Sequence, residues 1–155
     1  SVGRKPVRKV TEGKDLAGVT VFETIYQPGY IEAILYAEGK ESGKYRVETA
    51  SDELELRICE ENGEWGDVRF FEVCLTDRNG VLKTDCDRKI TVSVEGEGVL
   101  QGFGSALMTS TENFTQGEYT TFYGRAQLAV RPVGKGKIIV KAETDGTETL
   151  KKTFL

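Results

Sequence analysis

The chain has 155 residues, of which 38% are hydrophobic and 30% are charged, and its formal net charge is −4. This composition is typical of a folded globular protein rather than of a disordered segment. No Lys/Arg cluster exceeds a short pair such as Arg4-Lys5. We expect no nucleic-acid partner, because a phosphate backbone is neutralised by a concentrated basic surface. We expect no membrane partner either, since no apolar run approaches the roughly 20 residues that cross a bilayer.

Histidine is absent from the sequence, which excludes Ser-His-Asp and Cys-His nucleophile pairs and removes the commonest metal ligand. The cysteines Cys59, Cys74 and Cys86 lack the Cys-x-x-Cys spacing of zinc and redox sites, so we expect buried or semi-buried structural thiols, no metal and no cofactor. Three cysteines cannot pair completely, and no signal peptide is recognisable. These features favour a cytoplasmic compartment without establishing one.

Short segments of period-two alternation recur along the chain, and no amphipathic helix is predicted. In the first third, the alternation predicts strands at residues 19–24, 31–37 and 45–49. Three strands in roughly 50 residues bury a poor core unaided. We therefore expect residues 1–50 to be the C-terminal part of a truncated small β-sandwich domain, or to pack on the remainder of the chain.

The alternation is clearer in the second part of the chain. It predicts strands at residues 54–59, 71–76, 90–95, 126–131, 138–142 and 150–154. Val92 and Leu128 are predicted core residues on facing or adjacent strands, and Lys152 falls on the inward row of the last strand. A glycine corner and a short strand follow residue 95, and residues 105–117 are predicted to be a loop. About seven short strands at this spacing predict an all-β fold, with an immunoglobulin-like antiparallel β-sandwich over residues 51–155.

Several motifs of this second part resemble one known family, the C-terminal immunoglobulin-like domain of glycoside hydrolase family 2, whose members are β-galactosidase-like. The motifs are Thr76–Gly80, Val92–Gly98, Gly102–Ala106, Thr111–Phe114 and Gly124–Ala126. The first part is similar to the end of the small β-domain that precedes this one in the family. That likeness rests on Ile31–Tyr36, Gly39-Lys40 and Thr49-Ala50, with Ser1–Arg4 continuing a hairpin that is missing here. After the Gly-Ser-Ala turn, family members often carry Asn or Asp and then Pro, whereas this chain has Leu107-Met108.

The resemblance implies a bacterial parent enzyme that hydrolyses terminal β-galactosides or related β-glycosides with two glutamates on a separate (β/α)₈ barrel. It implies that this chain is a non-catalytic C-terminal accessory fragment with a structural or docking role, and that its partner is the rest of the hydrolase. Glycoside hydrolysis with retention needs two carboxylates about 5–5.5 Å apart. Glu95 and Glu97 flank Gly96, but a solvated glycine corner explains them, so no catalytic residue is carried over.

Two other functions stay open, a carbohydrate-binding module and an adhesion-type bacterial immunoglobulin-like repeat. An oligosaccharide partner needs exposed aromatic faces on which sugar rings can stack. The candidates for carbohydrate or interdomain contact are Trp65, Phe103 and Tyr123. Trp65 lies in a strongly polar segment of the sequence, so we expect it in a loop, where it either caps the sandwich or contacts a ligand. The glycines of residues 96–104 do not predict a phosphate site, because no helix is expected after them.

Overall fold

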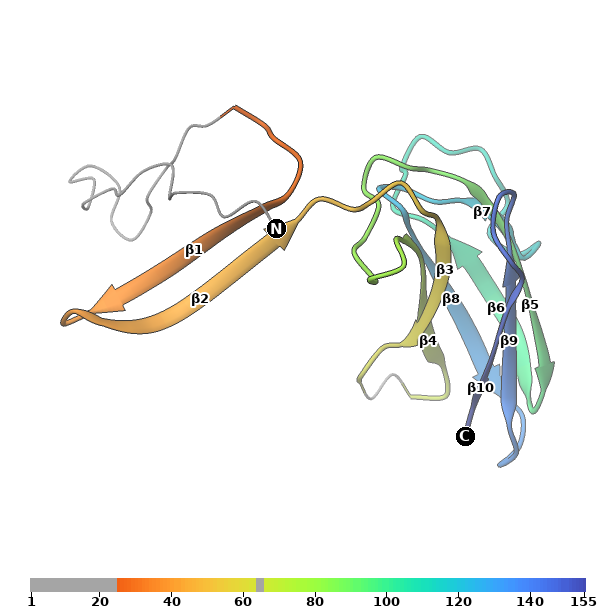
Figure 1. The fold of residues 1–155 in the computed structure, drawn as a ribbon. Helices are drawn as coiled ribbons and strands as arrows, with labels where there is room; N and C mark the ends of the chain where they lie inside the picture. Colours follow the sequence, from red (N-terminus) through yellow and green to blue (C-terminus); the bar gives the residue numbers. More distant parts are fainter. Residues whose placement is uncertain (1–24, 64–65) are drawn as a thin grey trace. The chain divides into compact units, whose positions relative to one another are not determined.

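A computed structural model describes residues 25–63 and 66–155, which contain ten β-strands and no helix (Figure 1). The chain divides into two compact units, Ser1–Glu48 and Thr49–Leu155. The strand predicted at residues 19–24 lies outside the described residues. The all-β class predicted from the alternation is confirmed.

The described part of the first unit is an antiparallel hairpin of β1 (Tyr30–Ala37) and β2 (Lys40–Glu48). Glu38 and Gly39 connect the two strands, and both have positive φ. Two consecutive residues with positive φ give the turn whose twist matches that of the flanking strands. Because side chains alternate between the faces of a strand, this register sorts apolar and polar residues onto opposite faces.

One face of this hairpin is apolar and open to solvent. It is formed by Ile31, Ala33, Leu35, Tyr45 and Val47, called here the apolar hairpin face. Leu35 is 65% exposed and Tyr45 is 73% exposed. A two-stranded sheet is at best marginally stable in water, and three or more strands or a packed face are needed for independent stability.

The opposite face of the hairpin carries ion pairs and a cation–π contact alongside the apolar Ile34. The Lys44 ammonium lies 2.9 Å from the Glu32 carboxylate. The Arg46 guanidinium lies 3.8 Å from the centre of the Tyr30 ring. The charged groups of this face are well hydrated, whereas exposure of the apolar hairpin face to water is unfavourable.

The second unit is a sandwich of two four-stranded antiparallel sheets, ordered β3-β4-β8-β6 and β10-β9-β5-β7 (Figure 1). Its strands are β3 (Glu55–Glu60), β4 (Arg69–Thr76), β5 (Lys89–Gly96), β6 (Gly98–Gly104), β7 (Glu118–Thr120), β8 (Arg125–Pro132), β9 (Ile138–Glu143) and β10 (Leu150–Phe154). In immunoglobulin constant-type domains, strands A, B, E and D form one sheet and C, F and G the other. Here β3, β4, β8 and β6 follow the first order, while β5, β9 and β10 follow the second, with β7 added beside β5. The predicted immunoglobulin-like sandwich is confirmed.

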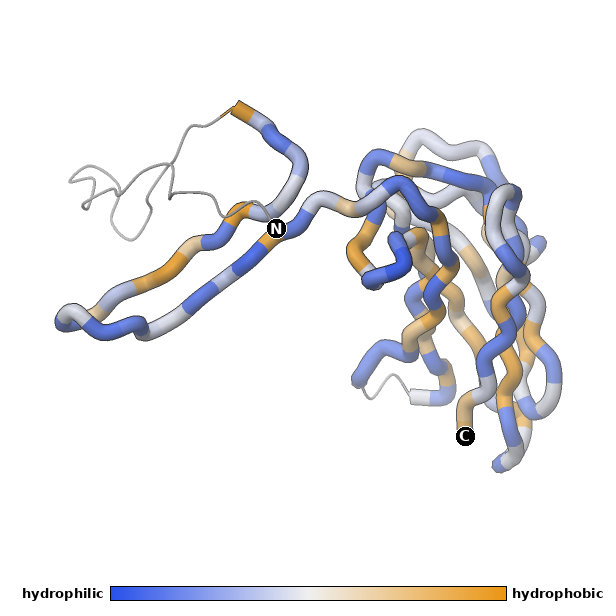
Figure 2. Tube along the Cα trace, in the orientation of Figure 1, coloured by the Kyte–Doolittle hydropathy of each residue, from blue (hydrophilic) through white to orange (hydrophobic). Residues whose placement is uncertain are grey.

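The core lies between the two sheets and is built from every second residue of the strands, as the alternating colours of Figure 2 show. Leu128 on β8 is opposite Phe71 on β4 and Phe103 on β6, and all three side chains are fully buried. Val92, on β5 of the other sheet, is also buried. The predicted core positions Val92 and Leu128 are therefore confirmed.

The corner between β5 and β6 depends on Gly96, which has a φ of 83°. A Cβ at this position would collide with the carbonyl oxygen of Lys137. Glycine adopts this conformation without steric cost, so the strand can change direction immediately. The register of β6 then shifts between Leu100 and Gly102. The predicted glycine corner thus lies at Gly96, and Gly102 lies at a bulge.

The sequence predicts Lys152 on the inward row of the last strand, but in the structure its side chain is exposed. Its neighbours Leu150 and Phe154 pack against the core, but Lys152 is exposed and donates a hydrogen bond of 2.8 Å to the carbonyl of Ile58. The lysine stem follows the inner row while its ammonium reaches a polar partner at the edge. This bond ties β10 of one sheet to β3 of the other.

Replacing Leu128 by Ala is expected to lower the free energy of unfolding by about 2–5 kcal/mol, because burial is lost and a cavity forms between Phe71 and Phe103. The exposed neighbour Gln127 provides the matched control, and Gln127→Ala should cost less than about 0.5 kcal/mol. Urea denaturation measures both variants. Equal losses would mean that the faces of β8 are reversed.

Candidate functional site

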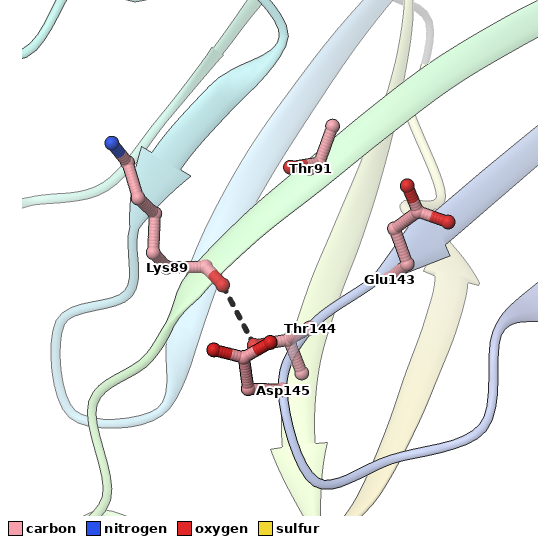
Figure 3. A pocket seen from close by; sticks show the side chains of 5 residues that line it. All are labelled: Lys89, Thr91, Glu143, Thr144 and Asp145. Atoms are coloured by element: carbon pink, nitrogen blue, oxygen red, sulfur yellow. Dashed lines mark hydrogen bonds between the residues drawn. The ribbon is translucent and has the colours of Figure 1, made fainter.

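A polar depression of about 350 Å³ opens beside β5 and the end of β9 (Figure 3). Its lining consists of Lys89, Thr91, Glu143, Thr144 and Asp145. The Thr144 hydroxyl donates a hydrogen bond of 2.7 Å to the Lys89 carbonyl, and the Lys89 ammonium forms an ion pair with Glu118. Because these five side chains are all polar, the depression offers a sugar hydrogen bonds but no aromatic face for stacking.

The structure separates the three aromatic residues proposed from the sequence as contact residues. Trp65 lies outside the described residues. Phe103 is fully buried in the core, so it has no surface for a ligand, and the proposed contact is not supported for it. The sequence concealed this role because Phe103 lies between Gly102 and Gly104, which give no apolar alternation. Tyr123 is 58% exposed and is the one of these three with a described, accessible ring.

Tyr123 occupies a tight turn that leads into β8. Phe122 pairs with Arg125 across this turn, and the two central residues have φ values of 51° for Tyr123 and 70° for Gly124. A bulky residue with positive φ is strained, and such strain is of order 1–3 kcal/mol. The Tyr123 ring packs on Phe122, with 4.4 Å between the ring centres. The turn therefore displays an aromatic ring at an energetic cost.

Asp87 holds this turn in place from the loop before β5. Its Oδ1 accepts hydrogen bonds from the Gly124 amide at 2.9 Å and from the Thr121 hydroxyl at 3.1 Å. Thr121 is itself buried and accepts a hydrogen bond from the Arg88 amide. Sequence reasoning missed Asp87, because nothing local indicates a partner on a distant turn.

Glu112 fixes the loop of residues 105–117 in a similar way. Its carboxylate accepts hydrogen bonds from the Thr120 amide at 3.1 Å, the Thr120 hydroxyl at 2.9 Å and the Ser110 hydroxyl at 3.2 Å. Although desolvation opposes ionisation, the bonds from Thr120 and Ser110 lower the pKa of Glu112 overall. The loop contains no strand, as predicted, yet it is anchored to β7.

Asp77 is the most deeply buried of these carboxylates, with 2% of its surface exposed. Its Oδ1 accepts hydrogen bonds of 2.9 Å from the amides of Asn79 and Val81. The amide of Ser51 contributes most to lowering the pKa of Asp77 to about 2, and against desolvation the Val81 amide, the Ser51 hydroxyl and the Asn79 amide act in the same direction. Asn79 and Gly80 are typical turn residues, but the sequence does not reveal that the Asp77 side chain organises the turn.

The pKa shifts found in the sandwich are typical of carboxylates that accept stabilising hydrogen bonds or ion pairs. The general acid of a glycosidase needs a raised pKa, whereas the pKa is lowered for Asp77, Glu112 and Glu95. Glu95 is held by an ion pair of 2.9 Å with Lys151. The backbone of Glu97, its neighbour across the corner, is hydrogen-bonded to Lys137 and Val133. The corner is thus organised by backbone bonds and a surface ion pair.

The three cysteines are free thiols, as the sequence predicted. Cys74 is buried, and Cys59 and Cys86 are half-buried. Desolvation, followed by the nearby Glu72 carboxylate, raises the pKa of Cys74 to about 11. A thiol with a raised pKa is a poor nucleophile and a poor metal ligand.

Within residues 25–63 and 66–155, no group of three or more His, Cys, Asp or Glu side chains is placed to hold a metal ion. The same described residues include no helix long and apolar enough to cross a bilayer.

Residues 59–153 match the family model of glycoside hydrolase family 2 C-terminal domain 5. The chain belongs to this family. The beta-galactosidase BoGH2A of Bacteroides ovatus is 27% identical over 139 residues, which cover 86% of this chain and 16% of that protein.

Solved structures of two bacterial glycosidases extend the likeness to the fold. A glycosyl hydrolase family 2 member from Bacteroides cellulosilyticus matches with a TM-score of 0.74 and 25% identity, over 84% of this chain and 19% of that one. A beta-glycosidase from Bacteroides vulgatus matches with the same TM-score of 0.74 and 21% identity, over 83% and 17%. The chain therefore spans less than a fifth of the length of each of these relatives.

The hydrogen bonds to Asp77 make stability depend on pH. Because the pKa of Asp77 in the folded state is about 2 and its ordinary value is 3.8, its contribution is complete above the ordinary value and is lost as the pH falls toward the folded value. Asp77→Asn should therefore be less stable than the wild type at about pH 6, and the difference should shrink by about pH 2. Urea denaturation across this range measures it. Parallel stability curves would contradict the assignment.

Proposed function

We propose that this chain is a non-catalytic C-terminal accessory fragment of a β-galactosidase-like family 2 glycoside hydrolase, acting on O-glycosyl bonds through the rest of that enzyme. Its role in carbohydrate hydrolysis is structural, through packing against the remaining parts of the enzyme. In this proposal, residues 51–155 are the immunoglobulin-like C-terminal domain, and residues 1–50 are the C-terminal part of a small β-sandwich domain.

The observation that carries this proposal is the apolar hairpin face. Ile31, Leu35, Tyr45 and Val47 are all more than half exposed, although each fully buried side chain of this size stabilises a protein by about 1.5–3 kcal/mol. A hairpin with one polar and one apolar face has the pattern of a sheet that packs against another layer. The small share of its relatives' length that the chain spans supports a partner layer within a longer enzyme.

The carboxylates of the sandwich support a non-catalytic role. Asp77, Asp87 and Glu112 accept hydrogen bonds from backbone amides and hydroxyl groups of loops. For Asp77 and Glu112 these bonds lower the pKa and favour the ionised form, whereas proton donation to a leaving group needs a carboxyl group that stays protonated. These residues are therefore suited to holding loops in place.

Tyr123 favours a second candidate function, carbohydrate binding. Its exposed ring rests on Phe122, and the strained turn keeps it at the surface. Strain of this kind often accompanies binding sites, and an aromatic face can stack on the C–H surface of a sugar. A single exposed ring without converging polar groups makes a small platform, so the structural role has the stronger support.

One experiment on this chain tests both functions. The purified chain should neither hydrolyse aryl β-galactosides nor bind galacto-oligosaccharides in calorimetric titration. Turnover that scales with protein concentration and survives repurification would contradict the non-catalytic assignment. Saturable sugar binding that is lost in Tyr123→Ala, but retained in the matched surface variant Tyr45→Ala, would favour the carbohydrate-binding function instead.

A further inference from the structure

Ser51 lies close to the point where the chain enters the sandwich. Only Thr49 and Ala50 separate it from Glu48, the last residue of β2. Each residue extends the chain by at most about 3.6 Å, so a two-residue connection has little slack. The contacts of Ser51 therefore decide how freely this connection can move.

All the polar groups of Ser51 are bound by residues of the sandwich. Its amide and its hydroxyl donate to Oδ2 of Asp77, at 3.0 and 3.1 Å. The hydroxyl also contacts the Glu53 carboxylate. The Lys83 ammonium donates to the Ser51 carbonyl at 2.5 Å. Ser51 is thus held on both its amide side and its carbonyl side.

The partners of Ser51 are themselves rigidly placed. Asp77 directly follows β4, and its other oxygen closes a turn through the amides of Asn79 and Val81. Lys83 is fixed by its backbone amide, which donates to the Leu75 carbonyl at 3.0 Å. Because Asp77 is almost fully buried, its hydrogen bonds are shielded from water and are charge-assisted.

We propose that Asp77, Ser51 and Lys83 form a clasp that holds the chain at its entry into the sandwich and restricts the movement of Thr49 and Ala50. Asp77 is a positioning residue in this clasp. The connection before the sandwich then acts as a restrained joint rather than as a free tether. In a larger enzyme, such a joint limits the positions that the immunoglobulin-like domain can take. It does so without an additional contact surface.

Two sets of variants separate the clasp from the fold. In Asp77→Asn, the amide carbonyl can still accept from Asn79 and Val81, while the amide NH₂ faces the Ser51 donors and cannot accept from them. In Ser51→Ala/Lys83→Met, the turn is untouched, and the bonds from the Ser51 hydroxyl to Asp77 and from the Lys83 ammonium to the Ser51 carbonyl are removed. Asp145→Asn, at an exposed turn of the same sandwich, is the matched control. A methyl NMR spectrum of the core verifies that each variant is folded.

The clasp is tested by two rates measured on the whole chain, the exchange of the Ser51 amide hydrogen and the cleavage of the Glu48–Thr49 bond by a glutamyl endopeptidase. Both rates should rise by about tenfold or more in Asp77→Asn, and less in the double variant, since they follow local opening of the joint. Both should be unchanged in Asp145→Asn. Faster exchange with unchanged cleavage, or no change in either rate, would overturn the proposal.

Discussion

Apolar packing between the two sheets is the interaction on which the rest of the sandwich depends. Phe71, Leu128 and Phe103 lie side by side across three strands of one sheet and are fully buried. Because every second residue of these strands is committed to the core, polar side chains remain for the outer faces and the loops. The carboxylates there are used to fix turns, as Asp77 and Asp87 do.

Period-two alternation predicted the long strands of the sandwich because each of them commits one face to the core. The three-residue strand β7 buries a single aromatic residue, Tyr119, which is too little to produce a periodic signal. Phe103 is buried without a periodic signal either, because glycines flank it in the sequence. The contact between Asp87 and Gly124 joins residues that are 37 positions apart, and no local pattern indicates such a pair.

The same alternation has a different outcome in the hairpin. Alternate residues of both strands form the apolar hairpin face, yet Leu35 and Tyr45 remain exposed. In the sandwich, two sheets bury each other's apolar faces, whereas the described part of the first unit has a single two-stranded sheet. In the proposed function, this exposed face packs against another layer of a longer enzyme.

The burial of the apolar hairpin face is tested most directly by measuring the cost of Leu35→Ala in two settings, this chain and a longer enzyme that carries it. In this chain the loss of stability should be below about 0.5 kcal/mol, because Leu35 is 65% exposed. In the longer enzyme it should reach about 2–5 kcal/mol, the cost of truncating a buried leucine. Lys44→Ala, on the polar face, should cost little in both. An equally small loss for Leu35→Ala in both proteins would contradict the structural role.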